Sequence, residues 1–146
     1  MFDLLIGDTA GDLQLPDRYR PEGLIHRAQD GTPMRSKSEV IVYEVLSGLG
    51  LAPVYEQRLY SQGSETDYCL PDFTIQHGGK TWYWEHLGML NRPQYREDWI
   101  RKEAWYHRNG FADRLLTSKD HEGGPGGILY ADEVRSLARD RILGTA

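Results

Sequence analysis

A pair of glycines at positions 78 and 79 constrains this chain more than any other feature, because it separates two segments with the character of β-strands. Residues 70–75 precede the pair and include β-prone apolar side chains, and residues 81–87 follow it with a high density of aromatics. Consecutive glycines between such segments are typical of a tight turn that joins antiparallel strands. We therefore predict a hairpin built from these two segments.

Two acidic residues meet at the open end of this hairpin. Asp72 stands near the start of the first strand and Glu85 near the end of the second, so the turn brings them to the same end. Side chains alternate along a strand, so Glu85 and Leu87 share one face and the His86 ring packs on the other. Two such carboxylates suit a hard divalent cation such as Mg²⁺. The alternative is a pair of acids in solvent at the ends of strands.

A helix is predicted to begin at position 36. Ser36 and Glu39 form the S-x-x-E pattern of a capping box, in which two side chains satisfy backbone N–H groups at the helix start. The glycines at positions 48 and 50 end the helix. Helical periodicity gives it an apolar face, whose members are Ile41, Val42, Val45, Leu46 and Leu49.

A second helix is predicted from Arg92 to about Gly110, because a proline follows Arg92 and glycine favours the position after a helix end. One stripe of this helix contains Tyr95, Trp99, Lys102 and Tyr106. The aromatic members indicate that the stripe faces inward, which makes a lysine unusual there. Either the Lys102 amine extends to the helix edge, or a negative charge compensates it.

The remaining chain supplies further elements of one domain, which is large enough to bury a core. Strands are predicted over residues 54–59 and 111–117, and a last amphipathic helix over 131–142. Residues 118–127 form a Gly-rich loop. Prolines and glycines break residues 1–33 into an irregular arm, which we expect to pack on the domain formed by residues 34–146. The alternative is that the arm is the joint to a partner.

Two segments of the hairpin, Pro71-Asp72-Phe73 and Trp84-Glu85-His86-Leu87-Gly88, resemble the active-site hairpin of the PD-(D/E)XK nuclease superfamily. The resemblance covers roughly residues 34–130. It implies the restriction-endonuclease-like fold, an α/β fold with an αβββαβ core and a mixed central sheet flanked by helices. The N-terminal arm and the C-terminal helix are additions to this core. The predicted order of elements, namely helix, three strands, helix and strand, agrees with it.

The resemblance also implies a site for Mg²⁺, for which Mn²⁺ would substitute. Asp72 and Glu85 would hold one or two metal ions, together with the backbone carbonyl of His86. In the superfamily an acid early in the first helix often points into this site, and Glu39 stands at that place. Helix capping and metal binding compete for the Glu39 side chain, and the resemblance favours metal binding.

The superfamily pattern continues as Glu-x-Lys, but Leu87 stands where that lysine is expected. Several branches carry the lysine on a neighbouring helix, so Lys102 is the candidate replacement. Lys102-x-x-x-Tyr106 is also similar to the Gln-x-x-x-Tyr motif of RecB-like nucleases, whose pair lies near the metals and the nucleic acid. Resemblance to nuclease modules attached to helicases implies that this chain is such a module or acts beside a motor protein.

Basic residues near the starts of the two helices are candidates for binding phosphates. The candidates for nucleic-acid binding are Arg35, Lys37 and Arg96, together with the aromatic Tyr106. A solvated helix face of mixed charge is an equally good interpretation of each arginine. The formal net charge of −5 argues against a general nucleic-acid coat, but DNA contact requires only a local basic face.

The sequence thus favours a Mg²⁺-dependent nuclease that hydrolyses phosphodiester bonds, with DNA as the expected substrate and Asp72, Glu85 and Lys102 as catalytic residues. The alternative is a domain of the same fold that binds nucleic acid or protein without catalysis. No apolar run approaches the ~20 residues that span a membrane, and a single cysteine fits a reducing compartment. We therefore expect a cytoplasmic protein without a membrane partner.

Overall fold

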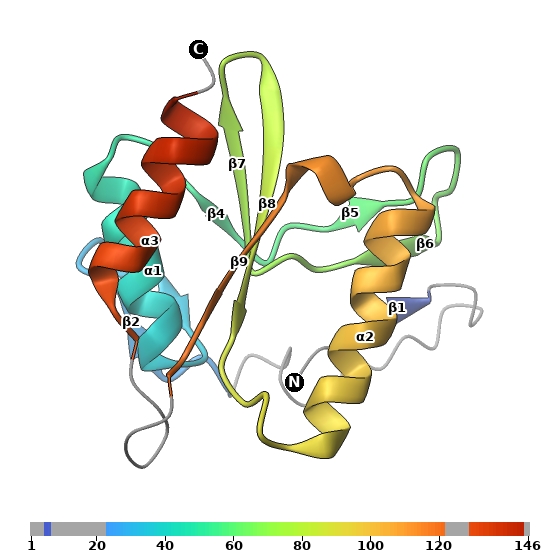
Figure 1. Cartoon of the computed structure of the whole chain (residues 1–146), viewed down its shortest axis with the longest axis horizontal. Helices are drawn as coiled ribbons and strands as arrows, with labels where there is room; N and C mark the ends of the chain where they lie inside the picture. The colour runs from blue at the N-terminus through green and yellow to red at the C-terminus, as the bar shows by residue number, and fades with distance from the viewer. Residues whose placement is uncertain (1–4, 7–22, 122–128, 145–146) are drawn as a thin grey trace.

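The central feature of the molecule is a mixed β-sheet with helices on both faces (Figure 1). The computed structural model describes residues 5–6, 23–121 and 129–144. Within these residues the sheet has four strands in the order β4-β7-β8-β9. Helices α1 (Lys37–Gly48) and α3 (Ala131–Ala138) lie on one side of it, and α2 (Pro93–Arg108) lies on the other. The predicted α/β class with a mixed central sheet is therefore confirmed.

The predicted hairpin forms the middle of the sheet. Strands β7 (Phe73–His77) and β8 (Lys80–Leu87) pair antiparallel, with Phe73 opposite Trp84 and His77 opposite Lys80. The turn glycines have φ angles of 62° and 75°. A two-residue turn with positive φ at both positions matches the twist of paired strands, and glycine adopts it without steric cost. The register places Asp72 and Glu85 at the same end of the hairpin.

The sheet is mixed because its last strand runs in the other sense. Strand β9 (Leu115–Lys119) pairs parallel with β8, with Tyr83 opposite Leu115 and Leu87 opposite Lys119. A parallel neighbour requires a crossover connection, which α2 provides. Along the four-stranded sheet the order of elements is therefore helix, three strands, helix and strand, as predicted.

Small sheets flank this centre. Strand β6 (Asp67–Cys69) pairs with β1 (Leu5–Ile6) and β5 (Leu59–Tyr60), and β2 (His26–Arg27) pairs with β3 (Pro33–Met34). Most of the predicted arm, residues 1–4 and 7–22, lies outside the described residues.

The prediction of a single strand over residues 54–59 is wrong. β4 (Val54–Tyr55) belongs to the central sheet and β5 to another sheet. The chain turns between them at Glu56, whose φ is 52°. A non-glycine residue in this left-handed region is uncommon and ends an extended segment.

Alternation along β8 divides the core into two halves. Trp82 and Trp84 pack with buried side chains of α1 and α3, among them Val42, Leu46 and Val134. On the other face, Tyr83 packs with Trp105 and Tyr106 of α2, and Leu87 packs with Tyr95 and Trp99. Both sides of the hairpin are thus covered, as the near-continuous apolar sequence of β8 requires.

The bounds of two elements and the buried face of α1 differ from the sequence analysis. Residues 112–114 form a 3₁₀ turn, η3 (Ala112–Arg114), so β9 begins later than predicted and includes Ser118 and Lys119. The last helix continues from α3 as a π-helical segment, η4 (Arg139–Leu143), through the buried Ile142. Ile41 does not share the buried face of α1, since 38% of it is exposed.

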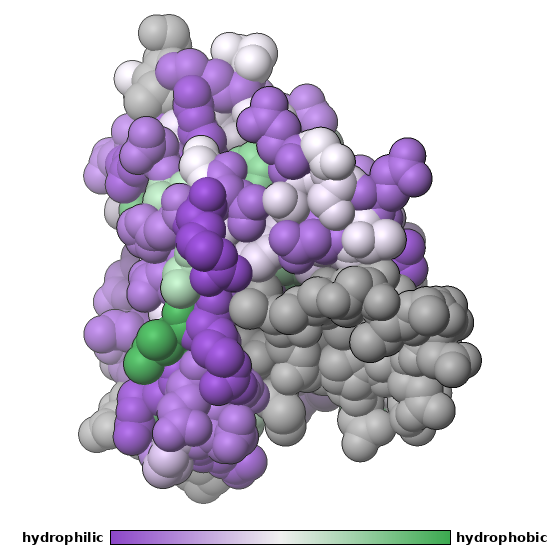
Figure 2. All heavy atoms as spheres, turned by 90° about the vertical axis from the view of Figure 1, so that its right-hand side faces the viewer, coloured by the Kyte–Doolittle hydropathy of each residue, from purple (hydrophilic) through white to green (hydrophobic). Residues whose placement is uncertain are grey.

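The outer face over α2 is mostly hydrophilic where Figure 2 colours it, although Ile100 on this helix is 61% exposed. None of the described helices has the length and hydropathy needed to cross a membrane.

The buried face of α1 can be tested by a matched pair of alanine substitutions. Leu46 is fully buried, so Leu46→Ala should lower the free energy of unfolding by about 2–5 kcal/mol. Ile41→Ala removes a side chain of the same size from the exposed face and should cost less than about 1 kcal/mol. Chemical denaturation of both variants measures the difference, and equal losses would contradict the assignment of the buried face.

Candidate active site

The predicted site residues lie at one end of the central sheet. The C-terminal end of β8 and the first turns of α1 and α2 come together there (Figure 1). Glu85 and His86 come from β8, Asp72 precedes β7, Glu39 lies in the first turn of α1, and Lys102 lies on α2. All five are buried in the protein.

Glu85 is the centre of the site. Its side chain is completely shielded from solvent, and its Oε2 atom lies 2.7 Å from the Lys102 ammonium. The Tyr106 hydroxyl donates to the same oxygen at 2.6 Å. Lys102 also donates to the backbone carbonyl of Leu70 at 2.7 Å. The lysine on the inner stripe of α2 therefore reaches the strand carboxylate, so a negative charge compensates it and its amine does not extend to the helix edge.

The protonation of Glu85 reflects two opposing effects. Burial raises the pKa of Glu85 to about 7, the positive charge of Lys102 lowers it, and the negative charge of Asp72 raises it further. Desolvation penalises the charged form of a carboxyl group, whereas a nearby cation favours it. Glu85 is therefore a carboxylate whose charge depends on Lys102.

Asp72 lies beside Glu85 and is held by the backbone of the neighbouring strand. Its Oδ2 atom accepts a hydrogen bond of 2.7 Å from the backbone N–H of His86. Its own N–H points to Glu85 Oε1 at 3.4 Å. The hairpin register thus fixes both acids at one end of the sheet, with the two side chains close enough for their charges to interact.

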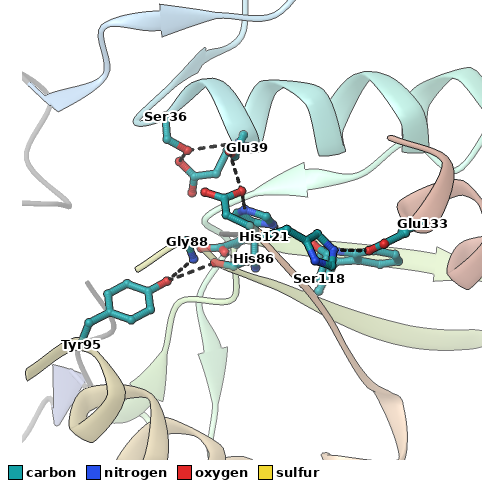
Figure 3. Close-up of polar contacts among 12 residues, drawn as sticks. Ser36, Glu39, His86, Gly88, Tyr95, Ser118, His121 and Glu133 are labelled. Atoms are coloured by element: carbon teal, nitrogen blue, oxygen red, sulfur yellow. Dashed lines mark hydrogen bonds and ion pairs between the residues drawn. The ribbon is translucent and has the colours of Figure 1, made fainter. Parts of the chain in front are cut away.

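Glu39 combines the predicted capping role with a place near the other acids. Its N–H donates to Ser36 Oγ at 3.1 Å, which caps α1, and Ser36 Oγ in turn donates to Glu39 Oε1 at 3.0 Å (Figure 3). The Tyr55 hydroxyl donates to the same Oε1 atom at 3.2 Å. Burial raises the pKa of Tyr55, and the negative charges of Glu39, Glu56 and Asp72 raise it further.

The expectation that the His86 ring is only a packing group is wrong. The ring is buried, but its Nδ1 lies 2.9 Å from Ser118 Oγ and its Nε2 lies 2.7 Å from Asp120 Oδ1. Ser38 in the first turn of α1 donates to the same Asp120 oxygen at 3.0 Å. Sequence reasoning missed these partners because it placed residues 118–127 in a loop, whereas β9 includes Ser118 and directs it toward β8.

The backbone of His86 is tied to α2 by a tyrosine. The Tyr95 hydroxyl donates to the His86 carbonyl at 3.3 Å and accepts from the N–H of Gly88 at 2.8 Å (Figure 3). The carbonyl predicted as a metal ligand is thus directed to the α2 side of β8, the side on which Lys102 lies.

The four predicted nucleic-acid-binding residues are not together on one surface. Lys37 and Arg96 are exposed. Arg35 instead pairs with Glu56, through Nε to Oε2 at 2.9 Å and Nη2 to Oε1 at 3.2 Å. Tyr106 is completely buried and bonded to Glu85, so its ring has no exposed face on which a base can stack. Arg35 and Tyr106 therefore bond to acidic side chains of the protein itself.

The donor atoms at the site are oxygens, which are the ligands that Mg²⁺ prefers. Among the described residues, no group of three or more His, Cys, Asp or Glu side chains is arranged to hold a metal ion. Mg²⁺ is usually held by one or two carboxylates together with water and substrate phosphates, and not by a complete protein cage. The adjacent Asp72 and Glu85 carboxylates fit such a site.

Comparison with known proteins gives one partial likeness. A stretch of 83 residues, 56% of this chain, is 34% identical to a protein of Methanocaldococcus jannaschii named uncharacterized protein MJ1519. The matched stretch covers only 7% of that protein. No protein-family model matches the chain, and no solved structure matches it. An assignment of function must therefore rest on the chemistry of the site.

The coupling between Glu85 and Lys102 predicts a pH-dependent stability. Because the folded chain holds the Glu85 proton more tightly than the unfolded chain does, Glu85 lowers stability as the pH rises from about 4.5 to about 7. Lys102→Met removes the compensating charge and raises the pKa of Glu85 further. The variant should therefore lose more stability at pH 8 than at pH 5, measured by denaturation at both pH values.

The control for this measurement is Lys80→Met, which removes the same charge from an exposed position at the start of β8. It should lose the same small amount of stability at both pH values. An equal loss of stability at pH 5 and pH 8 for Lys102→Met would show that the pKa of Glu85 does not depend on the charge of this lysine.

Proposed function

We propose that this chain is a Mg²⁺-dependent nuclease of the PD-(D/E)XK type, which hydrolyses phosphodiester bonds in DNA. The observation that carries the proposal is the contact of the Lys102 ammonium with Glu85 beside Asp72. Two acids and a lysine are the residue types that the superfamily pattern requires, and here the lysine comes from α2 in place of Leu87. The element order and the parallel pairing of β8 with β9 support assignment to the restriction-endonuclease-like fold over residues 34–146.

In this mechanism Asp72 and Glu85 would hold the metal, with the His86 carbonyl and Glu39 as further oxygen donors. Bound Mg²⁺ would supply a water of lowered pKa and neutralise charge on the phosphate. The backbone N–H of His86 fixes the orientation of Asp72. Lys102 provides a fixed positive charge next to Glu85, which orients the attacking water or stabilises charge on the phosphate.

A second candidate function is a domain that binds nucleic acid or protein without catalysis. The observation that favours it is the exposed fraction of 0% for both Glu85 and Lys102. A buried carboxylate that is already paired with an ammonium is satisfied without a metal. Under this alternative the pair stabilises the hairpin against α2 and has no part in a reaction.

The length of the relative supports a role as a module. The matched stretch is a small part of the M. jannaschii protein, so the related segment there belongs to a much longer chain. We propose that the present domain likewise acts with other domains or proteins on DNA, a helicase being the partner that the sequence resemblance favours.

Substitution of the site residues tests the catalytic proposal. Asp72→Asn and Glu85→Gln should abolish Mg²⁺-dependent cleavage of DNA, because each removes a charged metal ligand. Lys102→Met should lower the cleavage rate on the order of a hundredfold, which is the cost of losing one fixed charge-stabilising donor. Glu97→Gln changes an exposed acid on α2 and serves as the control, with the wild-type rate expected. Wild-type rates in all three site variants would show that these residues are not the catalytic site, whereas no Mg²⁺-dependent cleavage by the wild type would favour the non-catalytic alternative.

The exposed basic residues predict the salt dependence of DNA binding. Lys37→Ala and Arg96→Ala should each weaken binding to all sequences and reduce the slope of log affinity against log salt by about 1. Lys80→Ala, in the β7–β8 hairpin, is the control because the turn separates it from the site end of the sheet. Fluorescence anisotropy at several salt concentrations measures the slopes. An unchanged slope in both variants would place the phosphate contacts elsewhere.

A further inference from the structure

We infer that Arg35, Tyr55 and Glu56 form a clamp that sets the position of the Glu39 carboxylate relative to the backbone of Asp72 and so acts as a positioning device for metal binding. This inference rests on the proposed function, because it concerns the same metal site. Arg35 lies two residues before α1, and the other two lie at the end of β4. The clamp thus connects the helix that carries Glu39 to the segment that carries Asp72.

The first connection is the ion pair between Arg35 and Glu56. Two guanidinium nitrogens contact the two carboxylate oxygens, at 2.9 Å and 3.2 Å. Only 9% of the Arg35 side chain and 13% of the Glu56 side chain are exposed. A paired, two-point contact of this kind fixes orientation as well as distance, and partial burial protects it from screening by salt.

The second connection passes through the Tyr55 hydroxyl. It accepts a hydrogen bond from the backbone N–H of Arg35 at 3.1 Å and donates to Glu39 Oε1 at 3.2 Å. Burial and then the charges of the surrounding acids raise the pKa of Tyr55, so the hydroxyl keeps its proton. The ring packs against Phe73 of β7, with 5.6 Å between the ring centres. Tyr55 therefore holds the Glu39 carboxylate from a fixed point on the sheet.

The third connection is made by the backbone of Glu56. Its N–H donates to the backbone carbonyl of Asp72 at 3.1 Å. To do so the residue adopts a φ of 52°, a conformation that is rare without glycine and that the surroundings must stabilise. The same residue thus binds Arg35 with its side chain and Asp72 with its backbone.

Together these contacts form a continuous path from Glu39 through Tyr55, Arg35 and Glu56 to Asp72. The two acids come from different segments, and under the proposed function both would donate oxygens to the metal, which requires a defined separation between them. Groups that orient metal ligands without touching the metal typically change metal affinity when they are removed. The arrangement also explains why Arg35, at the start of a helix, is paired internally and not directed to solvent.

The test measures Mn²⁺ binding to the full chain by electron paramagnetic resonance, with cleavage kinetics in parallel. Tyr55→Phe removes the hydroxyl that holds Glu39, and Glu56→Gln weakens the pair with Arg35. Each should reduce Mn²⁺ affinity about tenfold, and the KM for DNA should stay within twofold of the wild type. Arg35→Lys, which keeps the charge but loses the two-point contact, should show the same direction of change.

Two matched controls separate positioning from a general loss of structure. Tyr43→Phe removes the hydroxyl of another tyrosine that packs on Phe73, but this hydroxyl bonds to Asp30 and not to Glu39. Glu65→Gln neutralises an exposed acid outside the clamp. Both controls should bind Mn²⁺ as the wild type does, and thermal unfolding checks that each variant is folded.

The outcomes distinguish the clamp from the nuclease. Wild-type Mn²⁺ affinity in folded Tyr55→Phe and Glu56→Gln variants would overturn the clamp. If either variant fails to fold, the Arg35→Lys variant decides by the same criterion. Binding of Mn²⁺ without cleavage by the wild type would overturn the nuclease proposal and leave the clamp to be judged by affinity. No Mn²⁺ binding by the wild type would overturn both.

Discussion

The ion pair between Glu85 and Lys102 is the interaction on which the arrangement of the site depends. A carboxylate on a central strand whose two faces are covered is costly to bury, and the lysine offsets that cost only if α2 lies at the correct distance and rotation. The aromatic residues on the inner stripe of α2 determine this placement through their packing on Tyr83 and Leu87. The hydrophobic packing of α2 against β8 therefore determines whether the buried charge of Glu85 is compensated.

Much of this arrangement was predictable from the sequence because it depends on local patterns. The Gly78-Gly79 turn fixed the hairpin, and the register of a hairpin fixes which residues lie opposite each other. Helical spacing was sufficient to place Lys102 on the inner face of α2. The hairpin register brings Asp72 and Glu85 together, whereas their meeting with Lys102 also depends on the packing of α2 against β8.

The parts that could not be predicted depend on contacts between distant segments. Glu56 lies in the middle of a predicted strand, and no neighbouring residue in the sequence indicates its positive φ. Its bonds are to Arg35 and Asp72, which are distant from it in the sequence. Asp120 and Ser118 looked like loop residues, and only the parallel pairing of β9 with β8 brings them to the His86 ring. Tyr106 was expected to contact nucleic acid, but burial against β8 directs its hydroxyl to Glu85.

The proposed function depends on one property above all, the binding of a divalent metal by the buried acids at this end of the sheet. The most direct measurement is a crystal structure of the protein with Mn²⁺, in which anomalous scattering locates the ion. The account predicts an ion coordinated by carboxylate oxygens of both Asp72 and Glu85, at about 2.1 Å as expected for a small hard cation. If the protein cleaves DNA under the same conditions but no ion lies at these two carboxylates, the proposed metal site is wrong.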